Sequence, residues 1–184
     1  MKLMYIGDPT TNTQDLFRIN ADGSGKQTLL TLSSGEGDAP AWSPDGQRVV
    51  GGGLWEFDSD GEDWFQITQG GTDPDWSPDG LKIVFDTGNG LAITGRDGGA
   101  VTPIPGTAGY TDPVWSPDGT QIAATGPGGL GTDSEIYTLK PDGSEISRLT
   151  FFGGRDPSWQ PLNPPPPQPP PLTGYPRPRG ASPL

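Results

Sequence analysis

The sequence predicts an all-β protein: a small β-propeller of four blades, each with four antiparallel strands, followed by an extended proline-rich tail. Three observations predict it. A turn-and-tryptophan motif recurs four times, each repeat holds a second Asp-Gly turn, and the glycines fall at regular turn positions. The motif tryptophans are 34, 39 and 44 residues apart: Trp42, Trp76, Trp115 and Trp159. A period of about 40 residues with short strands is typical of propeller blades.

The motif supplies the first turn of each repeat. Its full form, Ser-Pro-Asp-Gly, suits a type I turn, because proline presets φ at the second position and glycine closes the fourth. Three copies are full and the last is shortened to Trp159-Gln160-Pro161. We expect an innermost strand to end at each tryptophan, and a second strand to follow each full turn, at 47–50, 81–85 and 121–124.

The second half of each repeat predicts two further strands around the second Asp-Gly turn. The third strands are expected at 54–57, 91–94 and 135–139, and the fourth at 66–68, 102–104 and 148–150. Pro103 and Pro105 place the fourth strand at a sheet edge, because proline cannot donate to a central ladder. Each repeat is therefore predicted to be a four-stranded meander.

The two ends of the repeat region complement one another. Residues 2–6, 16–20 and 28–31 predict three strands of a first unit that lacks its innermost strand, and Asp156–Trp159 supplies a spare one. We expect the termini to exchange this strand and close a four-bladed ring within one chain, which removes open sheet edges. Closure between chains, as an eight-bladed dimer or an open row of subunits, is the alternative.

Two segments carry a family resemblance. Asp112–Gly119 reads Asp-Pro-Val-Trp-Ser-Pro-Asp-Gly, and Ile136–Thr150 contains Ile-Tyr-x-Leu-x-x-Asp-Gly-Ser and Arg-Leu-Thr. This pattern resembles the TolB-like, WD-related propeller repeats and recurs over residues 1–161. The resemblance implies a protein-binding or lid scaffold, often periplasmic or fused to a hydrolase domain.

Composition excludes several function classes. The chain has 23 acidic and 11 basic residues, a net charge of -12, and neither Cys nor His. Phosphate contacts need basic clusters, so we expect no nucleic-acid partner. Without Cys or His there is no Ser-His-Asp triad, thiol nucleophile, disulfide or His- or Cys-ligated zinc. No segment has the length of a signal-peptide core or membrane span, so we expect no membrane insertion, and the compartment stays open between periplasm, extracellular filament and virion.

Four acidic residues precede the innermost strands. If the blades are equivalent, these carboxylates ring one mouth of the channel, where a cation such as calcium could bind them. The alternative is that each aspartate caps the turn into its strand through local backbone hydrogen bonds. The candidate cation ligands are Asp38, Asp73, Asp112 and Asp156.

The aromatic residues are of two kinds, those repeated in every unit and those found in one unit only. The motif tryptophans are expected to fill the space between blades. Trp55, Trp64 and Phe65 occur in one repeat alone and are either gap-filling core residues or a contact patch. The loops at 7–14, 32–38, 106–111 and 125–134 vary between repeats, and such loops are common binding sites.

The composition changes at the end of the repeats, so the sequence predicts a propeller domain at 1–161 and a polyproline II tail at 162–184. Residues 1–160 carry 9 basic and 23 acidic side chains, net -14, whereas the tail has two arginines and no acid. A basic rod suits docking on an acidic neighbour, and a disordered linker is the alternative. The candidate interaction residues are Pro164, Pro165, Pro166, Pro167, Tyr175, Arg177 and Arg179.

These features together favour a non-enzymatic structural or interaction subunit. Its expected partners are proteins, first of all neighbouring copies of itself in a filament, surface-layer or virion assembly. The second hypothesis is a stand-alone TolB-like adaptor that binds a peptide or protein on its loop face, with or without calcium on the aspartate ring. The third is a glycan-acting enzyme with acids in the channel.

Overall fold

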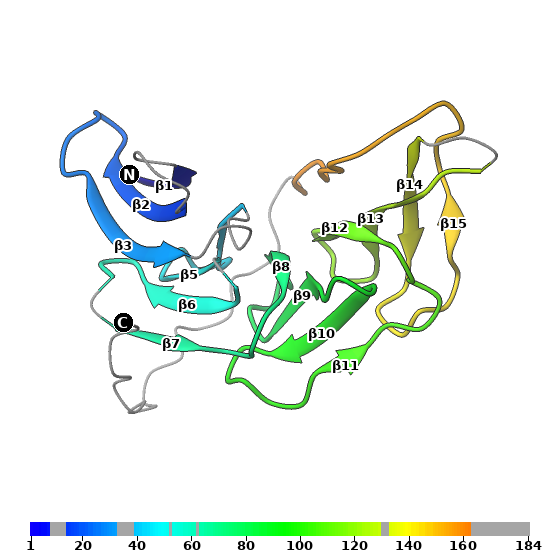
Figure 1. The fold of residues 1–184 in the computed structure, drawn as a ribbon, viewed down its shortest axis with the longest axis horizontal. Helices are drawn as coiled ribbons and strands as arrows, with labels where there is room; N and C mark the ends of the chain where they lie inside the picture. Colours follow the sequence, from blue (N-terminus) through cyan, green and yellow to red (C-terminus); the bar gives the residue numbers. More distant parts are fainter. Residues whose placement is uncertain (8–13, 33–38, 52, 62, 130–132, 163–184) are drawn as a thin grey trace.

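The computed structural model describes residues 1–7, 14–32, 39–51, 53–61, 63–129 and 133–162. These residues form fifteen β-strands and no helix, so the described part of the chain contains no helix that could cross a membrane. Four antiparallel sheets follow one another along an arc (Figure 1). The predicted all-β propeller architecture is therefore confirmed.

Each sheet is a simple meander in which sequence neighbours pair. The first sheet has three strands, β1 (Lys2–Gly7), β2 (Gln14–Asn20) and β3 (Gln27–Leu32). The second contains β4 (Ala41–Trp42), β5 (Arg48–Gly51), β6 (Trp55–Asp58) and β7 (Trp64–Gln66). The third contains β8 (Thr72–Trp76), β9 (Lys82–Asp86), β10 (Leu91–Gly95) and β11 (Thr102–Pro103). The fourth contains β12 (Thr111–Trp115), β13 (Ile122–Pro127), β14 (Ser134–Leu139) and β15 (Ser147–Arg148).

The Ser-Pro-Asp-Gly segments form the predicted turns. In the third sheet the N–H of Gly80 donates to the carbonyl of Ser77 at 2.8 Å, and the Ser77 hydroxyl donates to Asp79 Oδ1 at 2.6 Å. The same hydroxyl accepts the N–H of Lys82 at 2.9 Å, so one buried serine ties the turn to the next strand. The other two full copies repeat this geometry, which is why all three hairpins share one register.

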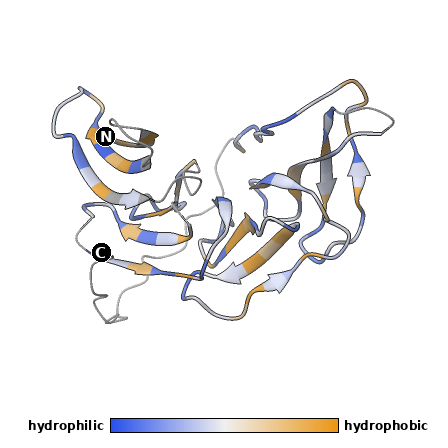
Figure 2. Cartoon of the chain, viewed as in Figure 1, coloured by the Kyte–Doolittle hydropathy of each residue, from blue (hydrophilic) through white to orange (hydrophobic). Residues whose placement is uncertain are grey.

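Apolar side chains fill the spaces between successive sheets, and Figure 2 shows them concentrated in strands such as β9 and β10. Trp76 and Trp115 are 4% and 7% exposed, which confirms core packing for these two motif tryptophans. Trp55 and Trp64 meet edge to face at 5.3 Å and pack between the first two sheets. The gap-filling interpretation of these two extra aromatics is therefore the correct one.

The predicted closure of the ring by the chain termini is not formed among the described residues. The first sheet has three strands, with β1 at its edge, and Asp156–Trp159 has no strand pairing. This segment instead packs on the fourth sheet, where the N–H of Asp156 donates to Thr125 Oγ1 and the Trp159 indole donates to the Val114 carbonyl. In Figure 1 this segment, drawn in orange, lies beside β12 and apart from β1.

Candidate functional site

A cavity of about 270 Å³ lies where the inner strands meet. The same position of each repeat contributes to it, an Asp-Pro pair at the start of the inner strand. The pairs that line it are Asp73-Pro74, Asp112-Pro113 and Asp156-Pro157. The repeat therefore brings three of the four predicted aspartates to one site, and the fourth, Asp38, lies outside the described residues.

The three aspartates share an unusual backbone conformation. Their φ angles are 48° at Asp73, 49° at Asp112 and 52° at Asp156, in the left-handed region that side chains rarely adopt. At Asp73 and Asp112 the strand register shifts, so each forms a β-bulge with its neighbour. The bulge bends the inner strand at the cavity. Aspartate tolerates this conformation better than most residues, which accounts for its repetition.

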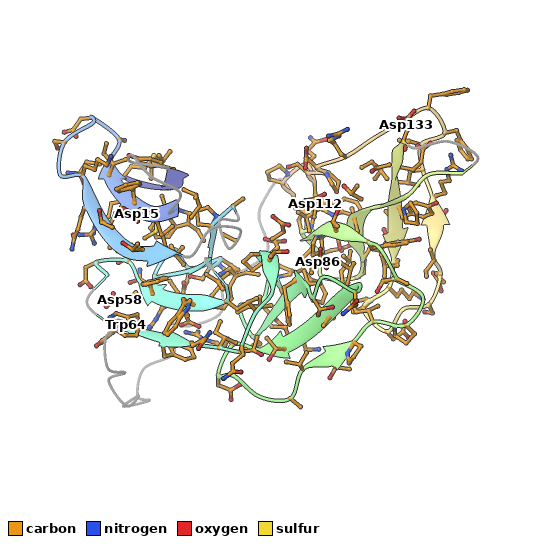
Figure 3. All side chains as sticks on the ribbon, viewed as in Figure 1. Asp15, Asp58, Trp64, Asp86, Asp112 and Asp133 are labelled. Atoms are coloured by element: carbon orange, nitrogen blue, oxygen red, sulfur yellow. The ribbon has the colours of Figure 1, made fainter. Side chains whose placement is uncertain are left out.

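Charge repulsion links the acidic residues of this cavity. Burial raises the pKa of Asp73 above its ordinary value, and the charges of Asp112, Asp86 and Asp156 raise the pKa further. Burial and Asp112 likewise raise the pKa of Asp86, which lies on β9 beside Asp112 (Figure 3). The mouth of the cavity is thus an acidic surface whose negative charges disfavour ionisation of Asp73 and Asp86.

The structure places the predicted cation ligands around one cavity without gathering them on one point. Within the described ranges, no three Asp, Glu, His or Cys side chains are arranged to hold a metal ion. The Asp112 carboxylate accepts the hydroxyl of Thr111 at 2.8 Å, rather than the local backbone N–H that the capping alternative expected. A calcium site that includes Asp38 stays a prediction.

Three other acids, not singled out from the sequence, hold the sheets together. Asp75 Oδ2 accepts the N–H of Trp115 at 2.7 Å and so connects β8 with β12, while burial raises the pKa of Asp75 to about 6. The fully buried Glu56 receives Arg96 from the next sheet at 3.2 Å. A charged residue between the aromatic residues Trp55 and Phe57 was the available signal for Glu56.

Glu135 is the third of these acids. It is 3% exposed, accepts Arg148 at 2.7 Å and receives the Thr150 hydroxyl. These two donors lower the pKa of Glu135, so the carboxylate is held ionised at the start of β14 in the fourth sheet. Its partners identify it as a structural anchor for the segment that follows β15.

One of the predicted variable loops is firmly packed. In the loop at 106–111, Thr107 and Tyr110 are 2% and 6% exposed, and the Thr107 hydroxyl bridges the Ile104 carbonyl and the Leu91 N–H. Residues 8–13, 33–38 and 130–132, which include most of the other predicted loops, lie outside the described residues. The tail residues Pro164–Pro167, Tyr175, Arg177 and Arg179 lie outside them as well.

An exposed apolar patch follows β15, and sequence reasoning missed it. Phe151 is 63% exposed and Phe152 fully exposed, while Leu149 beside them is 55% exposed. The Arg148 guanidinium lies 4.8 Å from the Phe151 ring. The signal was present in the sequence, since two phenylalanines stand after the last strand where no further sheet covers them. We call Leu149, Phe151 and Phe152 the C-terminal apolar patch.

No family model matches the chain, and no curated protein matches it by sequence. Among solved structures, TolB from Acinetobacter baumannii matches with a TM-score of 0.65 and 24% identity, over 84% of this chain and 42% of that one. A TolB-type protein from Agrobacterium tumefaciens matches with a TM-score of 0.70 and 20% identity, over 86% and 66%. The chain thus spans less than two thirds of the length of either TolB structure.

Two other matches show how widely this fold is used. The nidogen/laminin complex matches with a TM-score of 0.59 and 12% identity, over 82% of this chain and 62% of that one. An oligogalacturonate lyase in complex with manganese matches with a TM-score of 0.51 and 15% identity, over 78% and 46%. The same fold therefore occurs in a protein–protein complex and in an enzyme, and at these identities the likeness concerns fold alone. The chain is a β-propeller protein with a TolB-like fold.

Proposed function

We propose that this chain is a non-catalytic propeller that acts as an interaction and assembly subunit, with proteins as its partners. The C-terminal apolar patch is the observation that carries the proposal. Exposed phenylalanines that lie next to one another mark protein interfaces more often than isolated ones, because their burial on binding is favourable. The patch lies at one end of the arc, where a partner can approach without displacing a sheet.

The acids of the described core support a non-catalytic role. Asp75, Glu56 and Glu135 each bind a group of another strand or sheet and so serve the packing of the blades. The cavity aspartates occupy equivalent positions in their repeats, as a structural device of the repeat does. A catalytic pair instead needs two acids with different environments and different protonation states.

The tail gives the subunit a second contact. Residues 1–160 have a net charge of -14, and the tail holds Arg177 and Arg179 without an acid. Long-range attraction favours an arrangement in which Tyr175 and these arginines dock on the acidic surface of a neighbouring copy, with Pro164–Pro167 as a stiff spacer. Docking of this kind weakens at high salt, because exposed charges are screened.

Light scattering after size exclusion tests the proposal on the full chain, a form ending at Pro161, and a double change of Phe151→Ser and Phe152→Ser. Leu81→Ser is the matched control, because Leu81 is 49% exposed on a different sheet. We expect the full chain and the control to associate more strongly than the other two forms, which should dissociate to single chains at a higher concentration. A monomeric full chain at every concentration would overturn the assembly role and leave a monomeric adaptor.

The adaptor with calcium on the aspartate ring is the second candidate. The repulsion that raises the pKa of Asp73 favours it, since a divalent cation would relieve that repulsion. Calcium binding should raise the melting temperature of the full chain and have no effect on Asp112→Asn. An unchanged melting temperature of the native chain in calcium would remove this candidate.

A further inference from the structure

We propose that two copies of this chain join by strand docking, in which residues 156–161 of one copy pair with β1 of the other. This inference rests on the proposed assembly function and names its partner, a second copy, and its mode of contact. The docked segment would become the innermost strand of the first sheet, which has three strands here whereas the other three sheets have four.

The first half of the contact is the outer edge of β1 at Leu3, with which no strand pairs among the described residues. The strand registers make Leu3 equivalent to Val49, Ile83 and Ile122, since each pairs with the residue just before the second turn of its sheet. Val49, Ile83 and Ile122 are 0% exposed and lie opposite a motif tryptophan. Leu3 is 53% exposed and has no such tryptophan opposite it in its sheet.

The second half is a segment already shaped as an innermost strand. Asp156 has the same left-handed φ as Asp73 and Asp112. The Trp159 indole donates to the Val114 carbonyl at 3.1 Å, just as the Trp76 indole donates to the Ala41 carbonyl at 3.2 Å. The segment thus sits on the fourth sheet as β8 sits against the second.

Trp159 is half-buried, as is Trp42, whereas Trp76 and Trp115 are 4% and 7% exposed. Trp76 is covered by Ile83 and Phe85 of its own sheet and by residues of the second sheet such as Val50. The residues of the first sheet at those two positions are Leu3 and Tyr5. Trp159 and Leu3 therefore occupy the positions of a tryptophan–aliphatic pair like Trp76 and Ile83, but they do not contact each other within one chain.

In this conformation the two sides come from different copies. Figure 1 shows the orange segment that contains residues 156–161 beside β12 and apart from β1, so one chain does not bring them together here. Two copies related by a two-fold axis satisfy both contacts at once and make a ring of eight sheets with no open inner edge. Eight blades are within the range that propellers use.

The register of the docked strand follows from the other sheets. Trp76 lies opposite Ile83, and the N–H of Ser77 donates to the carbonyl of Lys82 at 2.9 Å. By equivalence Trp159 lies opposite Leu3, and Gln160 lies next to Lys2 of the other copy. This register specifies which residues a cross-link must join.

A charge on the docking edge gives the first test. Leu3→Arg should convert a dimer of the full chain to a monomer, because arginine cannot be buried against Trp159 without loss of solvation. Leu81→Arg is the matched control, a leucine of similar exposure just before β9, and it should stay dimeric. A Leu3→Arg chain that remains dimeric would overturn the inference.

Cross-linking gives the second test and identifies the mode of contact. The chain has no cysteine, so Lys2→Cys and Gln160→Cys each introduce a single thiol. An oxidised mixture of these two chains should give a covalent dimer that joins position 2 to position 160, and a mixture of Lys82→Cys with Gln160→Cys should not. A chain that carries both Lys2→Cys and Gln160→Cys gives the opposite outcome: if it forms its disulfide within one chain, the chain closes on itself and the inference fails.

The outcomes separate the inference from the function on which it rests. Association by mass without the cross-link between 2 and 160 would refute strand docking and leave the assembly role intact. The specific cross-link from chains that are monomeric by mass would support strand docking and refute a stable assembly. Neither a dimer nor the cross-link would refute both.

Discussion

Replacing Asp75 with asparagine should make the protein more stable at neutral pH and should leave its stability unchanged in acid. Asp75 lies between two inner strands, where its carboxylate accepts the N–H of Trp115 at 2.7 Å. Burial raises its pKa from 3.8 to about 6, and the N–H groups of Trp115 and Trp76 offset part of that rise. The asparagine oxygen can accept the same N–H without a charge that burial disfavours.

Proton linkage gives both the direction and the magnitude of the change in the free energy of unfolding. Because the folded-state pKa of Asp75 exceeds the unfolded value, the folded protein binds this proton more tightly, so stability falls as the pH rises from about 4 to about 6. The gap between 3.8 and about 6 corresponds to about 3 kcal/mol as an upper bound. The side chain retains some solvent contact, so Asp75→Asn should gain about 1–2 kcal/mol at neutral pH.

Urea unfolding followed by tryptophan fluorescence, from about pH 4 to about pH 8, measures the effect. The difference between Asp75→Asn and the native chain should grow between about pH 4 and pH 6 and then level off, while other titrating groups cancel in the difference. A difference that is independent of pH, or a variant that is less stable at neutral pH, would refute the claim that burial disfavours the ionised form of Asp75.

Three further changes test the packing and the acidic cavity by the same unfolding assay. Gly71→Ala should cost at least about 2 kcal/mol, because the backbone has φ +121° and the new methyl would overlap the Phe85 ring; normal stability would contradict this close packing. Trp76→Phe should cost about 1–3 kcal/mol through the lost bond to the Ala41 carbonyl and the cavity left behind; unchanged stability would contradict the burial of this ring. Asp112→Asn should raise stability by up to about 1 kcal/mol in calcium-free buffer, an effect that should shrink in acid where the cavity carboxylates are protonated.

Local features of this fold could be predicted from the sequence. The Ser-Pro-Asp-Gly turns depend on four adjacent residues, and the structure has each full copy in the expected hydrogen-bonded form. The burial of Trp76 and Trp115 followed from their repetition at the end of each inner strand. Spacing alone therefore identified the strands, the sheets and the place of Asp73, Asp112 and Asp156 at one cavity.

Features that depend on distant residues could not be predicted in the same way. Closure of the ring depends on the angle between successive sheets, which accumulates over the whole chain and has no local sequence signal. The bond from Trp115 to Asp75 spans 40 residues and depends on how two repeats meet. The left-handed backbone at Asp73 is likewise unexpected before a proline, because only the complete sheet holds it in place.

The mass of the full chain in solution, measured by light scattering over a range of concentrations, tests the central claim most directly. An arc completed by a second copy predicts a particle of twice 19.3 kDa, and Leu3→Arg should reduce it to the mass of one chain. A native chain of 19.3 kDa at every concentration would contradict the account.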